Sequence, residues 1–141
     1  MGEMDLESAF GLLDILCENA NRIIEPGYGL RAAESTFFEV VGLIRSNEQL
    51  KPYVLRKVST VMKTRDVASG VAMPSELVEL LAHEFRWPEF KDLAEQRLQA
   101  LFDGDRLLAM SDLSDHVILA LQDNWECRTF YRHYEQETNG G

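Results

Sequence analysis

Two prolines, Pro74 and Pro88, constrain the fold of this chain more than any other feature because each marks the start of an amphipathic helix. Proline is favoured at the first helical position, and the residue before a proline is pushed out of the α region. Trp87 is therefore expected in a bend, with one helix before it and a second helix that ends near Gly104. The short connection predicts that residues 73–104 form an antiparallel helical hairpin.

The rest of the chain shows the same helical spacing of apolar residues, three or four apart. Asp5 is expected as the N-cap of a first helix. Ser46 and Gln49 have the spacing of a capping box, which predicts a bend between two further helices. Helices are expected over about residues 30–45 and 50–64, after Ser111 or Ser114, and over about residues 126–134. No stretch alternates apolar and polar residues long enough for a strand, so the predicted class is all-α.

Length and composition predict a single domain over residues 1–135, followed by a disordered tail over residues 136–141. The chain has 141 residues, of which 45% are hydrophobic and 27% are charged, as is usual for a globular domain. A chain of this length can bury a sizeable core without disulfides or metals. Both cysteines, Cys17 and Cys127, fall on apolar helical rows and are expected to be reduced core residues.

Apolar positions recur when the chain is compared with itself at a spacing of forty residues. Leu77 falls on Phe37 and Val117, and Leu81 falls on Val41 and Leu121. This two-helix period resembles the HEAT and armadillo families of stacked helical hairpins. The resemblance covers about residues 30–134 and implies a small superhelix whose inner helices line a concave binding face. The alternative is an irregular helical bundle, in which any two amphipathic hairpins would align.

The charge of the chain is strongly negative, with a net charge of −10. Such a field repels phosphates, so we do not expect nucleic acid as the main partner. The segment 45–65 is the exception, since it has six basic residues and one acid. Arg56, Lys57 and Lys63 lie off the apolar stripe of their helix. They are expected to form a solvated face paired with acidic neighbours, or a docking patch for an acidic partner.

The chain shows no sign of a membrane segment or of a targeting segment. The first residues lack the basic start and apolar run of a signal peptide. No apolar run approaches the roughly 18 residues that span a bilayer. These observations predict a cytoplasmic protein that does not bind a membrane.

His83 and His116 are the candidate catalytic or metal-ligating residues. His83-Glu84 lies on a predicted helix, but a one-helix zinc site needs a second histidine at position 87, which is Trp87. His83 is therefore expected to be an exposed or capping side chain. The aspartates around His116 lack the spacing of a calcium loop, so they are expected to favour a helix N-terminus. No cofactor or metal is expected.

The aromatic segment 125–134 is the candidate contact surface. Trp125 and Phe130 align with apolar core positions of the preceding unit. The other large side chains are of the types that contribute most at protein interfaces, namely Arg128, Tyr131, Arg132 and Tyr134. Ordinary packing with a polar rim is the competing interpretation.

Together these features predict a non-enzymatic, cytoplasmic interaction module that binds another protein. An immunity-type or antitoxin-like inhibitor is one form of such a module, since an acidic surface could neutralise a basic partner. The alternative is a small enzyme or ligand-binding protein with a pocket between hairpins, using His83 or His116 and nearby carboxylates. The sequence leaves the oligomeric state open.

Overall fold

A computed structural model describes residues 5–24, 30–65, 72–122, 125 and 131 of the chain. This part of the chain is helical and contains no strand. Its elements are α1 (Leu6–Ile24), α2 (Leu30–Ser46), the short 3₁₀ helix η1 (Glu48–Leu50), α3 (Lys51–Lys63), α4 (Ser75–Phe85), α5 (Pro88–Phe102) and α6 (Leu113–Leu121). The predicted all-α class is confirmed.

Local sequence signals determine where several helices begin. The Asp5 carboxylate accepts a hydrogen bond from the Ser8 backbone N–H at 2.9 Å, as expected of an N-cap. Pro88 occupies the first position of α5, and Trp87 before it is extended. The predicted bend after α2 is present, but the capping box is not, because Asn47 precedes η1 without a side-chain cap.

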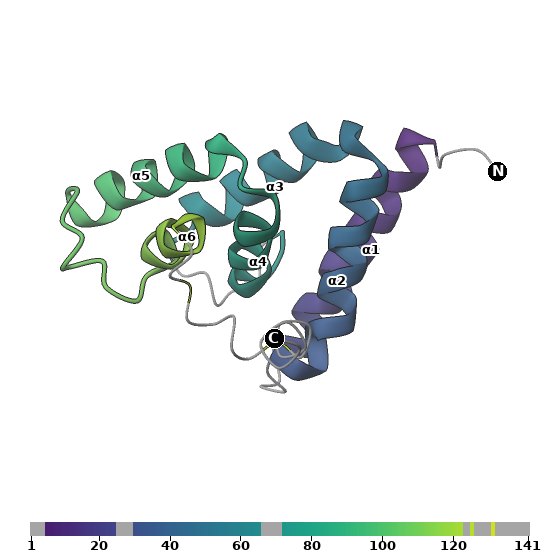
Figure 1. The fold of residues 1–141 in the computed structure, drawn as a ribbon, viewed down its shortest axis with the longest axis horizontal. Coiled ribbons are helices and arrows are strands. Elements are labelled where there is room, and N and C mark those ends of the chain that lie inside the picture. The colour runs from purple at the N-terminus through teal and green to yellow at the C-terminus, as the bar shows by residue number, and fades with distance from the viewer. Residues whose placement is uncertain (1–4, 25–29, 66–71, 123–124, 126–130, 132–141) are drawn as a thin grey trace, which may run out of the picture.

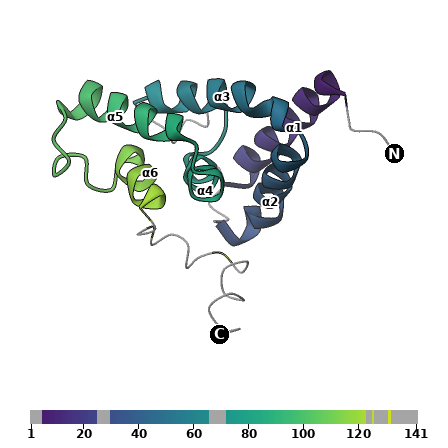
Figure 2. The ribbon, with the colours of Figure 1, turned by 45° about the horizontal axis from the view of Figure 1, so that its top comes forward.

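The helices form an elongated arrangement with α4 near its middle. Figure 1 shows α1 and α2 side by side at one end and α5 and α6 at the other, with α3 running between the two ends. The same layout is visible after rotation in Figure 2, where α4 is seen nearly end-on while α3 and α5 lie across the view. Helix α6 packs against both α4 and α5.

The hairpin expected over residues 73–104 does not form as a packed pair. Helix α4 runs across α5 instead of alongside it, and α5 packs on α3 and α6. Arg86 ends α4 in the left-handed conformation, with φ of 53°, which turns the chain sharply before Pro88. These contacts are those of an irregular helical bundle, the alternative to the repeat stack.

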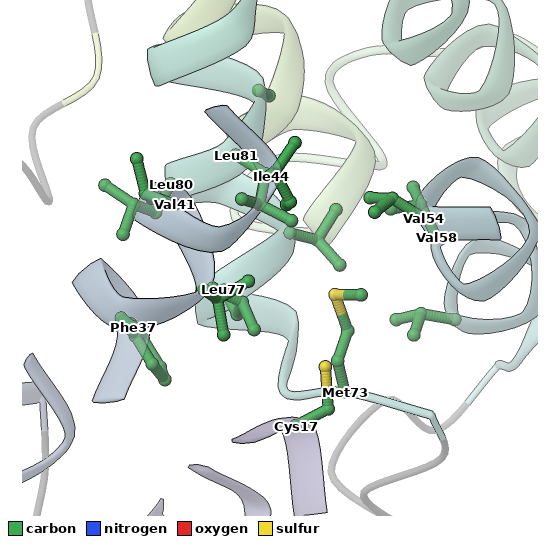
Figure 3. Close-up of a cluster of buried hydrophobic side chains, with 14 of the residues drawn as sticks. Cys17, Phe37, Val41, Ile44, Val54, Val58, Met73, Leu77, Leu80 and Leu81 are labelled. Carbon is green, nitrogen blue, oxygen red and sulfur yellow. The ribbon is translucent and has the colours of Figure 1, made fainter. Parts of the chain in front are cut away.

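One hydrophobic cluster connects α1 to α6, the α-helices of the described residues. Figure 3 shows its centre, where side chains of α2 face side chains of α4, with α3 and Met73 beside them. The labelled members are Cys17, Phe37, Val41, Ile44, Val54, Val58, Met73, Leu77, Leu80 and Leu81. Cys17 is a free, buried thiol, and burial raises its pKa to about 11. Cys127 lies outside the described residues.

The spacing of forty residues identified buried positions even though the hairpin stack is not observed. Phe37, Leu77 and Val117 are all fully buried. A core-facing stripe recurs in every amphipathic helix, whichever helix it packs against. The period therefore predicted which positions are buried. It did not predict which helices pack against each other.

Candidate functional site

The segment joining α5 to α6 exposes three large apolar side chains. Leu107 is 78% exposed, Leu108 is 68% exposed and Met110 is 67% exposed. We call Leu107, Leu108 and Met110 the apolar turn. It lies at the end of the molecule far from α1 and α2 (Figure 1). A cluster of exposed apolar side chains is typical of a contact surface.

Hydrogen bonds hold the apolar turn in a defined conformation. One Asp105 carboxylate oxygen accepts from the backbone N–H of Leu107 at 2.9 Å and of Leu108 at 3.4 Å. The Ala109 N–H donates to the Asp105 carbonyl at 3.2 Å, and the Ala109 side chain is buried. Leu108 and Met110 therefore point outward because Ala109 between them anchors the segment to the domain.

A buried ion pair supports the base of this segment. The Arg97 guanidinium of α5 donates to both carboxylate oxygens of Asp112, each at 2.9 Å. Arg97 also donates to the carbonyls of Met62 at 2.9 Å and Thr64 at 2.6 Å, at the end of α3. Asp112 in turn caps α6 by accepting from the Ser114 N–H at 2.9 Å. One arginine thus ties α3, α5 and the start of α6 together.

The hydrogen bonds to Asp112 lower the pKa of its carboxyl group. Burial by itself would raise the pKa of this carboxyl, but the hydrogen bonds from Arg97 and Ser114 outweigh it and lower the pKa to about 2. Asp112 is therefore ionised at neutral pH. Asp105, Asp112 and Asp115 accept hydrogen bonds from backbone N–H groups of the turn or of the start of α6, whereas Asp103 lies at the C-terminus of α5.

A second polar group lies between α4 and α6. The buried Glu79 carboxylate accepts from the indole Nε1–H of Trp125 at 2.9 Å and lies 3.1 Å from Nδ1 of His116. The His83 ring lies 5.2 Å from the Trp125 ring, centroid to centroid. The two candidate histidines, far apart in sequence, therefore belong to one group, in which His116 contacts Glu79 and His83 contacts Trp125.

The outcome for His83 differs from the sequence expectation. His83 was expected to be exposed or to cap a helix, but it is buried because α4 is covered by α2 and α6. His116 is half-buried, and its hydrogen bond to Glu79 raises its pKa above the usual value. A histidine held through Nδ1 by a carboxylate is an arrangement that proton-transfer sites also use.

Two of the basic side chains of α3, Lys51 and Lys57, are paired with acidic neighbours. Lys57 lies 2.6 Å from the Asp14 carboxylate of α1 and 5.2 Å from the centre of the Tyr53 ring. Lys51 lies 3.3 Å from the Glu89 carboxylate. Arg56 and Lys63 are exposed, as expected. Lys57 is half-buried, so it is a contact between α1 and α3 more than a part of a solvated face.

The predicted aromatic contact surface is only partly described. Tyr131 is fully buried at 0% exposure, with its ring 5.9 Å from that of Phe38 and 5.8 Å from that of Trp125. Tyr131 therefore packs within the domain beside α2, and its predicted contact with a partner stays a prediction. Trp125 is buried as expected. Arg128, Arg132 and Tyr134 lie outside the described residues, as does the predicted tail 136–141.

Comparisons with protein-family models, with characterised proteins and with solved structures returned no match. Within the described ranges, no group of three or more His, Cys, Asp or Glu side chains could hold a metal ion. Among the described helices, none is long and apolar enough to cross a membrane.

Sequence reasoning missed the apolar turn and both buried polar groups. The signal for the turn was present, since Leu107-Leu108-Ala109-Met110 is an apolar run too short for a helix and flanked by aspartates. The signals for the polar groups were weaker. Arg97 interrupts the apolar stripe of its helix, and a buried tryptophan requires a partner for its N–H.

Proposed function

We propose that this protein is a non-enzymatic binding module that contacts another protein through the apolar turn. The observation that carries the proposal is the exposure of Leu107, Leu108 and Met110, each by two thirds or more, on a hydrogen-bonded segment. Burying such side chains contributes about 1.5–3 kcal/mol each. A partner that covers them gains part of this free energy, because the cost of association offsets the rest.

The order of the turn adds to this argument. Binding loses less free energy when the contacting segment already has its bound conformation. Asp105 holds the turn by accepting a hydrogen bond from the Leu107 backbone N–H, and the Arg106 guanidinium lies 3.1 Å from the Asp115 carboxylate of α6. The apolar side chains are therefore presented by a supported segment.

An inhibitor of the immunity or antitoxin type is one form that such a module can take. The net charge of −10 supports this form because a strongly acidic protein attracts a basic target at long range. The small size and helical fold are compatible with a protein whose function is to cover another surface.

Site-specific photocrosslinking in the native cells tests the proposed function. A photoreactive phenylalanine analogue replaces Leu108, and a matched variant carries it at Ile15, which is 55% exposed on α1. We expect a discrete protein adduct from position 108 that is absent from position 15. Excess unlabelled wild-type protein should suppress the adduct, whereas L107S/L108S/M110S should not.

The crosslinking result has two outcomes that contradict the proposal. Position 108 could give no adduct in cells that express the protein. Alternatively, the triple-serine variant could compete as well as the wild type, which would show that the apolar side chains contribute nothing to the contact.

The second candidate is a ligand-binding protein or small enzyme that uses His116. The observation in its favour is the carboxylate–imidazole pair of Glu79 and His116, with the His116 ring half-buried. A screen of small fragments by ligand-observed NMR tests it. Fragments that bind the wild type and are lost from H116A would support a site there, and a screen without such fragments would contradict it.

A further inference from the structure

The surroundings of the apolar turn are acidic. Between residues 98 and 122 the chain has four aspartates and a single arginine, with no lysine. Asp103 and Asp105 are exposed at the start of the turn. Arg106 is already 3.1 Å from Asp115, so its positive charge is offset locally. An approaching surface therefore meets apolar side chains next to unneutralised carboxylates.

This charge distinguishes between possible occupants of the turn. A second copy of the chain would bring the same net charge of −10 and the same acidic turn, and like charges disfavour that contact. Anionic lipid surfaces and nucleic acids are also negative. A protein surface with basic side chains around an apolar strip complements both properties of the turn.

The apolar side chains of the turn indicate which kind of partner surface can cover it. Three exposed apolar side chains within four residues form a short apolar contact, and the apolar face of an amphipathic helix is a partner surface that can cover it. Methionine is flexible and polarisable, so Met110 can adapt to an irregular apolar surface. Lysine or arginine side chains beside the apolar face of such a helix would lie near Asp103 and Asp105.

We infer that the apolar turn binds a cationic amphipathic helix of a partner protein, with Leu107, Leu108 and Met110 on its apolar face and Asp103 and Asp105 near its basic flanks. This inference rests on the proposed function and specifies its partner class. The apolar contacts hold the complex, and the aspartates select for positive charge and accelerate association.

Two synthetic helical peptides test the inference. One has leucine along one face and lysine elsewhere over roughly five turns, or about 18 residues, and the other has glutamate in place of lysine. Binding to the full chain is measured by calorimetry and by amide chemical shifts. We expect the lysine peptide to bind at least about tenfold more tightly than the glutamate peptide, with shifts centred on residues 105–112.

Three protein variants separate specific docking from general attraction to an acidic protein. L107S/L108S/M110S keeps every carboxylate and should weaken binding of the lysine peptide by at least about tenfold. I15S removes an exposed apolar side chain from α1 and should leave binding unchanged. D103N keeps a side chain that tolerates the left-handed φ of 52° and should weaken binding by a few-fold.

The variants are expected to fold, because the substituted side chains are exposed and make few contacts within the domain. A thermal melt of L107S/L108S/M110S within a few degrees of the wild type confirms this. Equal binding of the lysine peptide to the wild type and to the triple-serine variant would overturn the inference. So would shifts spread over the whole surface.

Other possible binding partners of the apolar turn are detected by separate experiments. Flotation of the protein with neutral phosphatidylcholine vesicles, lost in L107S/L108S/M110S, would assign the turn to a lipid surface and overturn the inference. Sedimentation showing a dimer that the triple-serine variant lacks would assign it to a second copy. A crosslinked partner at position 108 together with equal binding of both peptides would leave the proposed function standing and contradict only the partner class.

Discussion

At the scale of single residues, Arg97 connects three parts of the structure through its side chain. It is only 3% exposed, yet its guanidinium bonds to Asp112 and to carbonyls at the end of α3. A buried charge is tolerated only when it is paired and hydrogen-bonded throughout. The planar fork of arginine provides two parallel bonds to the carboxylate, which lysine cannot reproduce.

Replacing Arg97 by methionine should destabilise the protein by about 3–5 kcal/mol. The reason is that Asp112 and the carbonyl groups of Met62 and Thr64 would lose the donor they share. R56M on the exposed face of α3 is the matched control and should change the free energy of unfolding by less than about 1 kcal/mol. Urea denaturation measures both. A small effect of R97M would mean that the ion pair contributes little.

His116 should make stability depend on pH near neutrality. Its hydrogen bond to Glu79 raises its pKa in the folded state above the ordinary histidine value of 6.5. The charged imidazole therefore stabilises the fold fully below pH 6.5, and this contribution is lost as the pH rises through the folded-state pKa. Urea midpoints from pH 5.5 to 8.5 should fall more steeply for the wild type than for H116Q. Parallel curves would contradict this.

At the scale of single elements, the residues at both ends of α5 determine where this helix begins and ends. Helix α5 begins with Pro88 after the extended Trp87 and ends with Asp103 and Gly104 both at positive φ. The Trp87 ring stacks on Phe90, and Lys51 lies 5.2 Å above it. The bend is thus held by aromatic packing as well as by the backbone restriction of proline.

Two glycine-to-alanine substitutions should have opposite effects. Gly104 has φ of 80°, and an added Cβ would lie 3.0 Å from the Gln99 side chain, so G104A should destabilise by about 1–2 kcal/mol. Gly11 lies within α1 with nothing within 4 Å of an added Cβ, so G11A should stabilise by about 0.5–1 kcal/mol. Thermal melts of G104A, G11A and the wild type measure these changes in stability. The same sign for both would mean that the C-terminal turn of α5 differs from the one described.

At the scale of the whole molecule, the helices share one core. The central helix α4 packs against α2 and α6, and the hydrophobic cluster runs from α1 to Tyr131. In a stack of repeats, each unit contacts only its neighbours, and stability is close to a sum of local terms. A shared core instead predicts that a destabilising substitution in α4 also lowers the stability of the helices at both ends of the molecule.

Replacing Leu81 by alanine tests this shared core. Leu81 is fully buried in α4, so L81A should cost about 2–5 kcal/mol. Hydrogen exchange should lose protection in α1 and α6 by similar factors, because both helices depend on the same core. Loss of protection confined to α4 and its neighbours in sequence would instead favour a stack of independent hairpins.

The sequence by itself determined the helices, their apolar faces and several of their ends, because these depend on interactions between residues a few positions apart. Asp5, Pro88 and the buried Leu77 are examples. The tertiary structure alone decided which helices pack together, so α5 lies on α6 and not on α4. An apolar stripe specifies burial without specifying a partner.

The contacts of the candidate site could not be predicted from the sequence, because they also depend on which helices pack together. Arg97 meets Asp112, and Glu79 meets Trp125, only because the helix packing brings them together. Tyr131 is buried by α2, which is distant in sequence. The apolar turn is readable as a short apolar run, but its exposure depends on Ala109, whose burial places Leu108 and Met110 on the outside.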